Sequence, residues 1–304
     1  MGSRIDNRVI PVRKSRGIST YDVIRRFRKI FGPVKVGHSG TLDPEATGLV
    51  LLLTGRATRL SGYLMDLPKT YVADIKLGES TDTHDTEGTV VERGDWTGVS
   101  AGRIGEVLEG FIGRRTQVPP MYSAVKHRGR PLYELARRGE EVERKPREVE
   151  IYSIELISVD LPVFTIKTEC SRGMYVRVLA EEIGAELGIP AHLGGLERTR
   201  VGHFRVEDAV PDDELESLAG EDSPGVGPAE ALSHLPAVEL SEGEAERLAN
   251  GIPPKIPAGT APEGAVARLI LPGGELGAIA GIGPAGSVRL RRVFVSSPED
   301  RGDG

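Results

Sequence analysis

The sequence predicts an α+β protein, in which a large N-terminal domain built on a mixed sheet is followed by a small β-rich C-terminal domain. Segments with a strand period of two and segments with a helix period of 3.6 interleave up to Val210, without the regular rhythm of βαβ units. After Val210 the chain becomes rich in Pro, Asp, Glu, Gly and Ser. We therefore expect a domain over 1–210, a linker or surface loop over 211–230, and a second domain over 231–304.

Helices of the first domain are predicted from apolar spacing and end signals. One begins at Ser19 or Thr20 and stops at Gly32, and another begins at Ser100. The apolar positions of 176–187 are spaced three, four and four, and this helix ends at Gly188. Strands are expected over 49–53, 70–77, 149–159 and 163–170.

The second domain opens with a capping box, in which Ser241 precedes Glu244 by three residues. A short helix should follow and end near Gly251. From 265 to 295, apolar and polar residues alternate around Gly-Gly and Gly-Pro turns, as in a small barrel.

Composition narrows the class of protein. With 304 residues, 38% of them hydrophobic and 28% charged, the chain reads as an ordinary soluble protein. It contains no run of eighteen apolar residues, and its first residues lack the apolar centre of a signal peptide, so we expect a cytoplasmic protein without a membrane partner. A single cysteine, Cys170, excludes an internal disulfide, and six scattered histidines include no pair at metal-ligand spacing. We expect no metal and no other cofactor.

The net charge of -6 is unevenly distributed. Residues 210–304 carry 16 acidic and 7 basic side chains, or -9, whereas residues 1–209 carry 32 basic and 29 acidic, or +3. Within 126–147, eight basic residues face four acidic ones. Such a strip can follow a phosphate backbone, or it can be a solvated face of mixed charge, and charge alone favours neither interpretation.

The most informative stretch is 37–48, Gly-His-Ser-Gly-Thr-Leu-Asp-Pro-Glu-Ala-Thr-Gly. Asp43 stands between turn formers, and Pro44 restricts the backbone after it. The apolar run 49–53 anchors this loop in a core, while its tip stays polar. An Asp-Pro pair commonly caps a helix or stabilises a turn, and the alternative is a carboxylate held in place for chemistry.

Further blocks accompany this loop in a fixed order. They are Pro68-Lys69-Thr70-Tyr71 with the acidic loop 81–88, then 117–139, which begins Gln-Val-Pro-Pro-Met-Tyr-Ser, and finally Cys170-Ser-Arg-Gly-Met-Tyr-Val-Arg177 with Leu196-Glu-Arg198. Together with 37–48 they span residues 35–204. This ordered set resembles the TruB family of pseudouridine synthases, in its bacterial stand-alone form.

The resemblance assigns the chemistry. It implies that Asp43 is a covalent nucleophile, that Arg177 lies against it, and that Tyr71 stacks on the target base and takes part in proton transfer. A guanidinium a few ångströms away typically lowers a carboxyl pKa by roughly 1 to 3 units, so we expect an ionised Asp43. The family fold also implies a PUA-like C-terminal domain and an RNA-binding insertion at about 120–147.

The resemblance also implies a set of substrate-binding residues. His38 would fill the gap left by the extruded base, although a histidine hydrogen-bonded within a turn is an alternative. The resemblance implies that Asp85 orders the substrate. A metal site in its acidic loop is not favoured, because the spacing matches neither a calcium loop nor a zinc motif. The other members of the set are Tyr175, Leu196, Lys14, Arg137 and Arg138.

Three positions depart from the family pattern. The Lys-Pro-x-Gly motif reads Lys14-Ser15-Arg16-Gly17, Glu197 replaces a basic residue before Arg198, and the C-terminal domain is acidic. These departures weaken the case for Lys14 as a site residue, for the position of Glu197 as a phosphate contact, and for RNA binding by the second domain.

Three functions compete. The first is isomerisation of the T-loop uridine at tRNA position 55 by a monomer that uses a flipped-out base and no guide RNA. The second is the catalytic subunit of a guide-RNA ribonucleoprotein. The segment 132–147 argues against it, because this segment resembles the stand-alone enzymes. The third is an aspartyl-phosphate phosphotransferase, because Asp43-x-Glu45-x-Thr47 imitates its motif, but that motif should end a hydrophobic strand and Asp43 does not.

Overall fold

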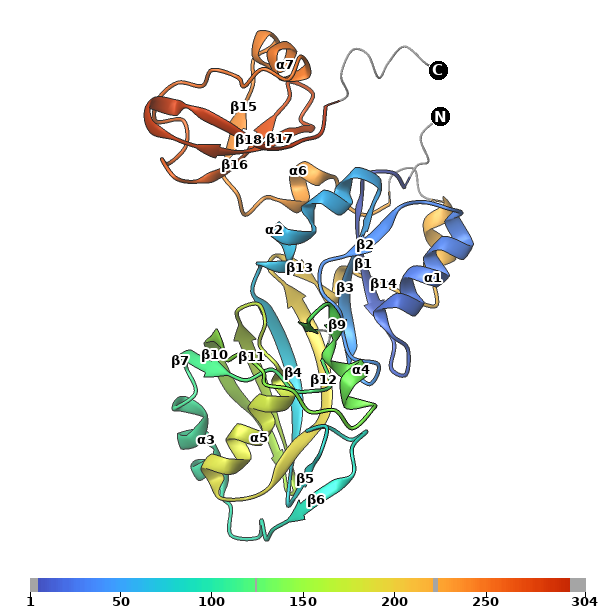
Figure 1. Cartoon of the computed structure of the whole chain (residues 1–304), viewed down its shortest axis with the longest axis vertical. Coiled ribbons are helices and arrows are strands. Elements are labelled where there is room, and N and C mark those ends of the chain that lie inside the picture. Colours follow the sequence, from blue (N-terminus) through green and yellow to red (C-terminus); the bar gives the residue numbers. More distant parts are fainter. Residues whose placement is uncertain (1–4, 124, 221–223, 296–304) are drawn as a thin grey trace.

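The architecture is a large mixed sheet with a smaller sheet at one end, seen in a computed structural model that describes residues 5–123, 125–220 and 224–295 (Figure 1). Within these residues no helix is long and apolar enough to cross a membrane. The strands of the large sheet are β1 (Val9–Lys14), β2 (Val36–His38), β3 (Thr47–Thr54), β4 (Lys69–Leu77), β7 (Gly113–Gln117), β10 (Arg147–Asp160), β11 (Val163–Cys170), β12 (Ala191–Val201), β13 (Phe204–Arg205) and β14 (Val210–Pro211).

The sheet order is β14-β1-β3-β12-β4-β11-β10-β7, with β2 paired to β3 and β13 paired to β12. Two pairs are parallel, β1 with β14 and β12 with β3, and the other pairs are antiparallel. Because Thr47 at the start of β3 pairs with Glu197 of β12 in a parallel register, the loop before β3 lies beside the central part of β12, near the middle of the sheet. The predicted α+β class with a mixed sheet is confirmed.

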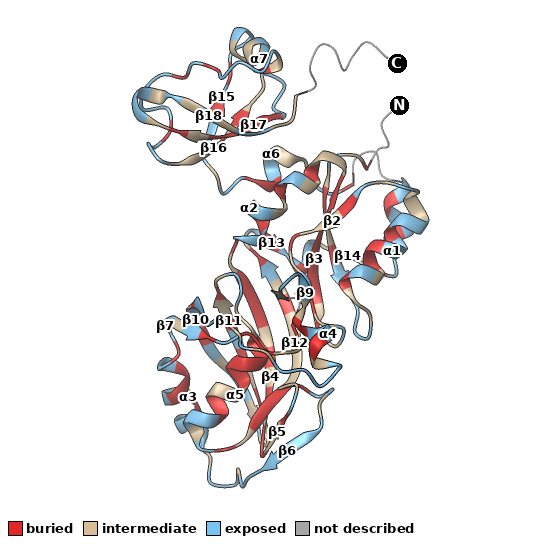
Figure 2. Cartoon of the chain, viewed as in Figure 1, coloured by how far each residue is buried: buried red, intermediate tan, exposed pale blue. Residues whose placement is uncertain are grey.

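Strand β3 contains the uninterrupted apolar run 49–53, and it is covered by hydrophobic cores on both faces. Leu49, Leu51 and Leu53 face one hydrophobic core, and Val50 and Leu52 face another on the opposite side of the sheet. All five side chains are fully buried. Since successive strand residues point to opposite faces, a strand covered on both faces cannot alternate with polar residues. Figure 2 shows the resulting buried centre of the sheet.

The three predicted helices form as expected. Helix α1 (Thr20–Phe31) begins with a capping box between Ser19 and Asp22, α3 (Ala101–Glu109) is capped by the Ser100 side chain, and α5 (Val176–Leu187) ends at Gly188 in the left-handed conformation. Helices α3 and α5 pack against the sheet, with α3 on β10 and α5 on β12 (Figure 1). The short helices are α2 (Ser61–Met65), α4 (Leu132–Ala136) and α6 (Pro228–Ala231).

The segment 211–230 is more ordered than a linker or surface loop. Strand β14 pairs with β1, and Leu215 and Leu218 are buried in the larger core. The abundance of turn formers predicts a boundary, but here the turns lie inside the packed domain because two leucines anchor them. Residues 221–223 lie outside the described residues.

Two smaller units complete the first part of the chain. The hairpin β5 (Glu79–Thr81) and β6 (Val90–Arg93) carries the acidic loop between its strands. The expected insertion at 120–147 holds the short pair β8 (Lys126–His127) and β9 (Arg130–Pro131), followed by α4. Ala124 of this insertion lies outside the described residues.

The second domain has four strands, β15 (Ala237–Glu239), β16 (Val266–Ile270), β17 (Leu276–Ile282) and β18 (Val288–Val293), with α7 (Glu242–Ala249) beside them. Ser241 caps α7 as predicted. The strands form an open sheet in the order β15-β16-β17-β18, rather than the expected barrel, within the residues described up to 295. Leu276 and Ile279 belong to the same hydrophobic core as Leu49, Leu51 and Leu53 of β3, so the two sheets share a core.

Candidate active site

Asp43 lies in the loop between β2 and β3, and the surrounding backbone is held at several points. The Leu42 amide donates to the Thr20 hydroxyl at 3.0 Å, and the Ala46 amide donates to the Asp43 carbonyl at 3.1 Å. Leu42 and Ala46 are buried, whereas the Asp43 side chain is 45% exposed. The loop is therefore fixed on both sides of a carboxylate that solvent can reach.

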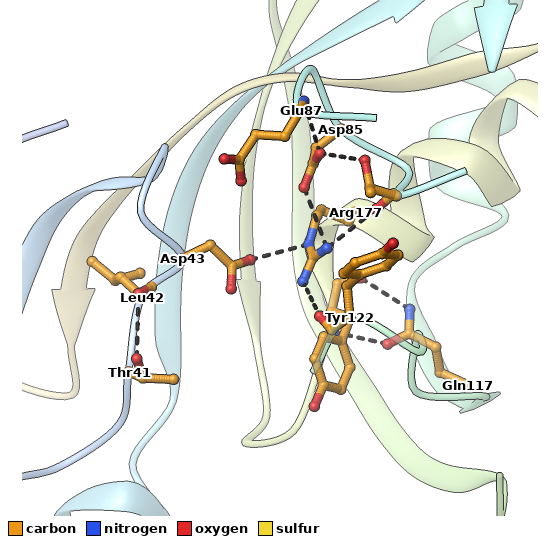
Figure 3. Close-up of polar contacts among 10 residues, drawn as sticks. Thr41, Leu42, Asp43, Asp85, Glu87, Gln117, Tyr122 and Arg177 are labelled. Atoms are coloured by element: carbon orange, nitrogen blue, oxygen red, sulfur yellow. Dashed lines mark hydrogen bonds and ion pairs between the residues drawn. The ribbon is translucent and has the colours of Figure 1, made fainter. Parts of the chain in front are cut away.

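Arg177, in the first turn of α5, binds two carboxylates and two carbonyl groups through one guanidinium (Figure 3). Its Nε lies 3.0 Å from Asp43 Oδ2, and its Nη1 lies 3.2 Å from Asp85 Oδ2. Nη1 also donates to the Thr83 carbonyl at 3.2 Å, and Nη2 donates to the Tyr122 carbonyl at 2.8 Å. The side chain is only 6% exposed, so its position is determined by these partners.

Gln117 holds the backbone just before Arg177, and sequence reasoning did not identify it as a site residue. Its side-chain oxygen accepts from the Tyr175 amide at 2.8 Å, and its side-chain nitrogen donates to the Tyr175 carbonyl at 3.2 Å (Figure 3). The side chain is buried at the end of β7. A buried amide that satisfies both groups of one residue's backbone fixes the start of α5, and therefore the approach of Arg177 to Asp43.

Asp85 belongs to the loop between β5 and β6, and its carboxylate is buried. Oδ1 accepts from the Thr83 hydroxyl at 2.6 Å and from the Glu87 amide at 3.0 Å, and Oδ2 faces Arg177. Asp85 is thus fully engaged on the far side of the guanidinium. The arrangement Asp43, Arg177, Asp85 places two carboxylates on one cation.

The electrostatics of Asp43 differ from the sequence expectation. Partial removal of the Asp43 carboxyl from water raises its pKa, Arg177 opposes this rise, and the charge of Asp85 adds to it. Arg177 lowers the pKa as expected, but the net direction is upward, so the expected net lowering of the Asp43 pKa was wrong. The guanidinium limits the rise and fixes the carboxylate, but it does not outweigh burial and a second carboxylate.

Tyr71 lies on β4, opposite Arg198 on β12, and is buried. Burial raises the pKa of its phenol, and Arg198, through its charge and a hydrogen bond, opposes the rise only in part. The charge of Asp43 raises the pKa further, so the two groups interact electrostatically. At neutral pH the phenol therefore keeps its proton.

Arg198 is the second residue that sequence reasoning missed. Its guanidinium donates to the carbonyls of Leu49 at 2.7 Å, Thr41 at 3.3 Å and Gly40 at 3.3 Å, and it is almost completely buried. It cannot be a surface phosphate contact. It connects the aspartate loop to Tyr71, and the motif 196–198 was the only sequence signal that pointed to it.

Two expected substrate-binding residues make hydrogen bonds within the protein. His38 Nδ1 accepts from the Gly40 amide at 3.2 Å, and burial together with Arg198 lowers the pKa of its ring. This hydrogen bond is the turn-stabilising alternative considered for His38. Lys14 is fully buried, and its ammonium donates only to carbonyl oxygens among the described residues, so it supports the loop rather than facing a substrate in solution.

The remaining expected residues separate into two places. Leu196 lines one cleft together with Asp43, Asp85 and Arg177, and Tyr175 lies at the N-terminus of α5 beside them. Arg137 and Arg138 follow α4 outside this cleft, and the Arg137 guanidinium lies 5.7 Å from the Tyr133 ring centre. Arg137 and Arg138 are therefore separate from the Asp43 cleft, whereas Tyr122, at the start of the insertion, contacts Arg177 through its carbonyl group.

The comparisons with known proteins agree with this geometry. Residues 28–176 match the TruB family pseudouridylate synthase N-terminal domain. A tRNA pseudouridine synthase B of Syntrophotalea carbinolica is 41% identical over 300 residues, which cover 95% of this chain and 98% of that protein. The protein of the same name from Geobacter sulfurreducens is 42% identical over 248 residues, covering 81% of this chain and 82% of the relative.

Among solved structures, a chain of a Cbf5-Nop10-Gar1 complex superposes with a TM-score of 0.75 at 25% identity, covering 98% of this chain and 87% of that chain. The likeness therefore includes both domains, and the sequence matches extend across the loop of Asp43, the strand of Tyr71 and the helix of Arg177. The chain belongs to the TruB family and is a pseudouridine synthase.

Proposed function

We propose that the protein isomerises uridine to pseudouridine in the T-loop of tRNA, at position 55, with Asp43 as the covalent nucleophile and without a guide RNA. The observation that carries this proposal is the ion pair of 3.0 Å between Arg177 and a half-exposed Asp43 in a cleft. A positioned carboxylate beside a buried guanidinium suits attack on a nucleoside.

The reaction needs no redox step. The bond between uracil N1 and the ribose breaks, the base turns, C5 joins the ribose, and the proton on C5 moves to N1, so atoms and electrons balance within one nucleoside. Asp43 would form a covalent adduct that is released before product leaves. Tyr71, protonated at neutral pH, offers an aromatic face for the base and a hydroxyl for proton transfer.

Two observations support tRNA as the substrate. The relatives that cover most of this chain are named tRNA pseudouridine synthase B. The insertion also carries a basic surface, since Lys126, Arg128, Arg144, Lys145 and Arg147 line one shallow depression. Solved structural neighbours come from a Cbf5-Nop10-Gar1 complex and from an H/ACA RNP bound to a substrate RNA, so the test must separate the stand-alone enzyme from the guide-dependent alternative.

The first prediction is that the purified protein alone modifies an unmodified tRNA transcript. With no guide RNA, no added nucleotide and excess EDTA, we expect pseudouridine at position 55, detected by carbodiimide primer extension. A transcript with cytidine at position 55 serves as the control. Activity only after adding a guide RNA would support the ribonucleoprotein alternative, and activity lost on chelation and restored by one metal would place a metal in the acidic loop.

The second prediction concerns the insertion. Replacing Arg137 and Arg138 together by Ala should weaken tRNA binding and flatten the slope of log affinity against log salt, by about one unit for each phosphate that is no longer neutralised. The single-turnover rate at saturating enzyme should stay close to the wild-type rate, because both side chains lie outside the cleft. Filter binding at several salt concentrations measures the slope. An unchanged slope would mean that this surface is merely solvated.

A further inference from the structure

Asp212 follows β14 in the segment that joins the two domains, and it is a buried carboxylate outside the cleft. Oδ1 accepts from the Ser15 amide at 2.7 Å, and Oδ2 accepts from Arg26 Nη1 at 2.7 Å. Its own amide donates to the Arg13 carbonyl at 3.0 Å. Asp212 therefore fixes the chain where β1 ends and the turn 14–18 begins.

That turn reaches the nucleophile loop through one carbonyl group. Lys14 Nζ donates to Pro44 O at 3.0 Å, and the Gly17 amide donates to the same oxygen at 2.9 Å. Lys14 also holds its own turn through the carbonyls of Ser15 at 3.0 Å and Ile18 at 2.7 Å. The Pro44 oxygen belongs to the peptide between Pro44 and Glu45, so the turn holds the backbone one residue after Asp43.

We propose that Asp212 is a positioning residue for pseudouridine formation, because it fixes the turn through which the Lys14 ammonium holds the Pro44 carbonyl group, one residue after Asp43. The inference rests on the proposed role of Asp43 as the nucleophile. The proposed role extends the active site to the segment after β14, which lies beyond the motifs of the family. This segment reaches the nucleophile only through the backbone of another loop.

The charge on Lys14 makes this role measurable. Burial lowers the pKa of its ammonium to about 8, and Arg198 lowers it as well, while Asp212, Asp43 and Glu45 raise it. Below this pKa the ammonium has a proton for each of its three carbonyl partners. As the pH rises through this pKa, Lys14 Nζ loses one of its three protons, and its hydrogen bonding to the Pro44 carbonyl weakens. Among the three carboxylates, Asp212 has the largest effect, so removing its charge lowers the pKa further.

The experiment compares single-turnover rates between pH 5.5 and 9.5, with enzyme saturating over tRNA. We expect the wild-type rate to decline above about pH 8, and Asp212→Asn to move this decline downward by roughly half a pH unit or more while the acid side of the profile is unchanged. The matched control is Asp213→Asn, which removes the same charge from an exposed neighbour and should leave the decline in place. Asp212→Glu, which keeps the charge, should restore the wild-type position.

Lys14→Arg provides a second test that does not depend on folding of the Asp212 variant. A guanidinium stays protonated over this range, so the decline near pH 8 should disappear. If Asp212→Asn folds but declines at the same pH as wild type, or if Lys14→Arg keeps the decline, the proposal is wrong. Turnover by an Asp43→Asn variant would instead overturn the proposed nucleophile, so the two failures are distinct.

Discussion

Replacement of Asp43 by Asn should abolish pseudouridine formation while tRNA affinity stays within a few-fold of wild type. The amide has nearly the same shape as the carboxylate and can still contact Arg177, but it cannot form the covalent adduct. We expect a rate loss of roughly 10⁴-fold or more, the scale seen when a covalent nucleophile is removed. Single-turnover tritium release from labelled tRNA and filter binding provide the two measurements.

The control is Asp208→Asn, an exposed residue at which the same substitution should leave the rate unchanged. Asp43→Ala should be as inactive as Asp43→Asn, which excludes slow deamidation of the asparagine as a source of activity. Measurable turnover by both variants, purified free of host enzyme, would remove Asp43 from the mechanism.

The same assignment fixes the sign of the pH dependence on the acid side. The pKa of Asp43 is raised by burial and by Asp85, so the ionised fraction begins to fall at a higher pH than for an ordinary aspartate. As the pH is lowered, the wild-type rate should therefore begin to decline at a higher pH than the pKa of an ordinary aspartate would predict. Arg177 limits the rise, which is one reason why its replacement should be costly.

Local features of the fold were predictable because their causes lie within a few residues. Ser19 and Asp22 form a capping box that defines the start of α1, and Gly188 ends α5 by adopting a left-handed conformation. The apolar run of β3 predicted a strand, but its contact with two separate cores depends on what covers each face. Neighbouring residues carry no information about that covering.

Site residues were predictable only where they belong to the sequence blocks that resemble the family. The loop of Asp43 and the position of Arg177 came from the resemblance, and their ion pair follows from it. The resemblance includes Arg198 in the block 196–198 but does not reach Asp212, and the burial of these two side chains was not predictable from sequence, because buried charges are rare and an arginine or aspartate near turn formers is usually exposed. Their burial results from partners far away in the chain, such as the Leu49 carbonyl and Arg26.

The expected direction of the net pKa shift of Asp43 was wrong for a related reason. A pairwise argument that considers only Arg177 gives a lowering, whereas the folded protein adds burial and the charge of Asp85. Both additions come from loops that the sequence separates widely. A site that combines one cation with two carboxylates can be evaluated only when all three groups are placed.

Replacement of Arg177 by Lys should lower the single-turnover rate by roughly 10²-fold, because a misplaced reacting group costs about that much. The guanidinium spans Asp43, Asp85 and two carbonyl groups from one rigid plane. A lysine ammonium places all its donors on one atom and cannot reach the same set. The positive charge is kept, so the salt dependence of tRNA binding should change little.

Arg172→Lys is the matched control, since Arg172 is exposed near the same helix and pairs with Asp66 on the surface. It should leave the rate unchanged. The decisive contrast is with the double replacement of Arg137 and Arg138, which should alter the salt slope and spare the rate. If Arg177→Lys keeps a near-normal single-turnover rate and loses only affinity, then Arg177 binds phosphate in the complex, and the ion pair with Asp43 is a feature of the free protein that the reaction does not use.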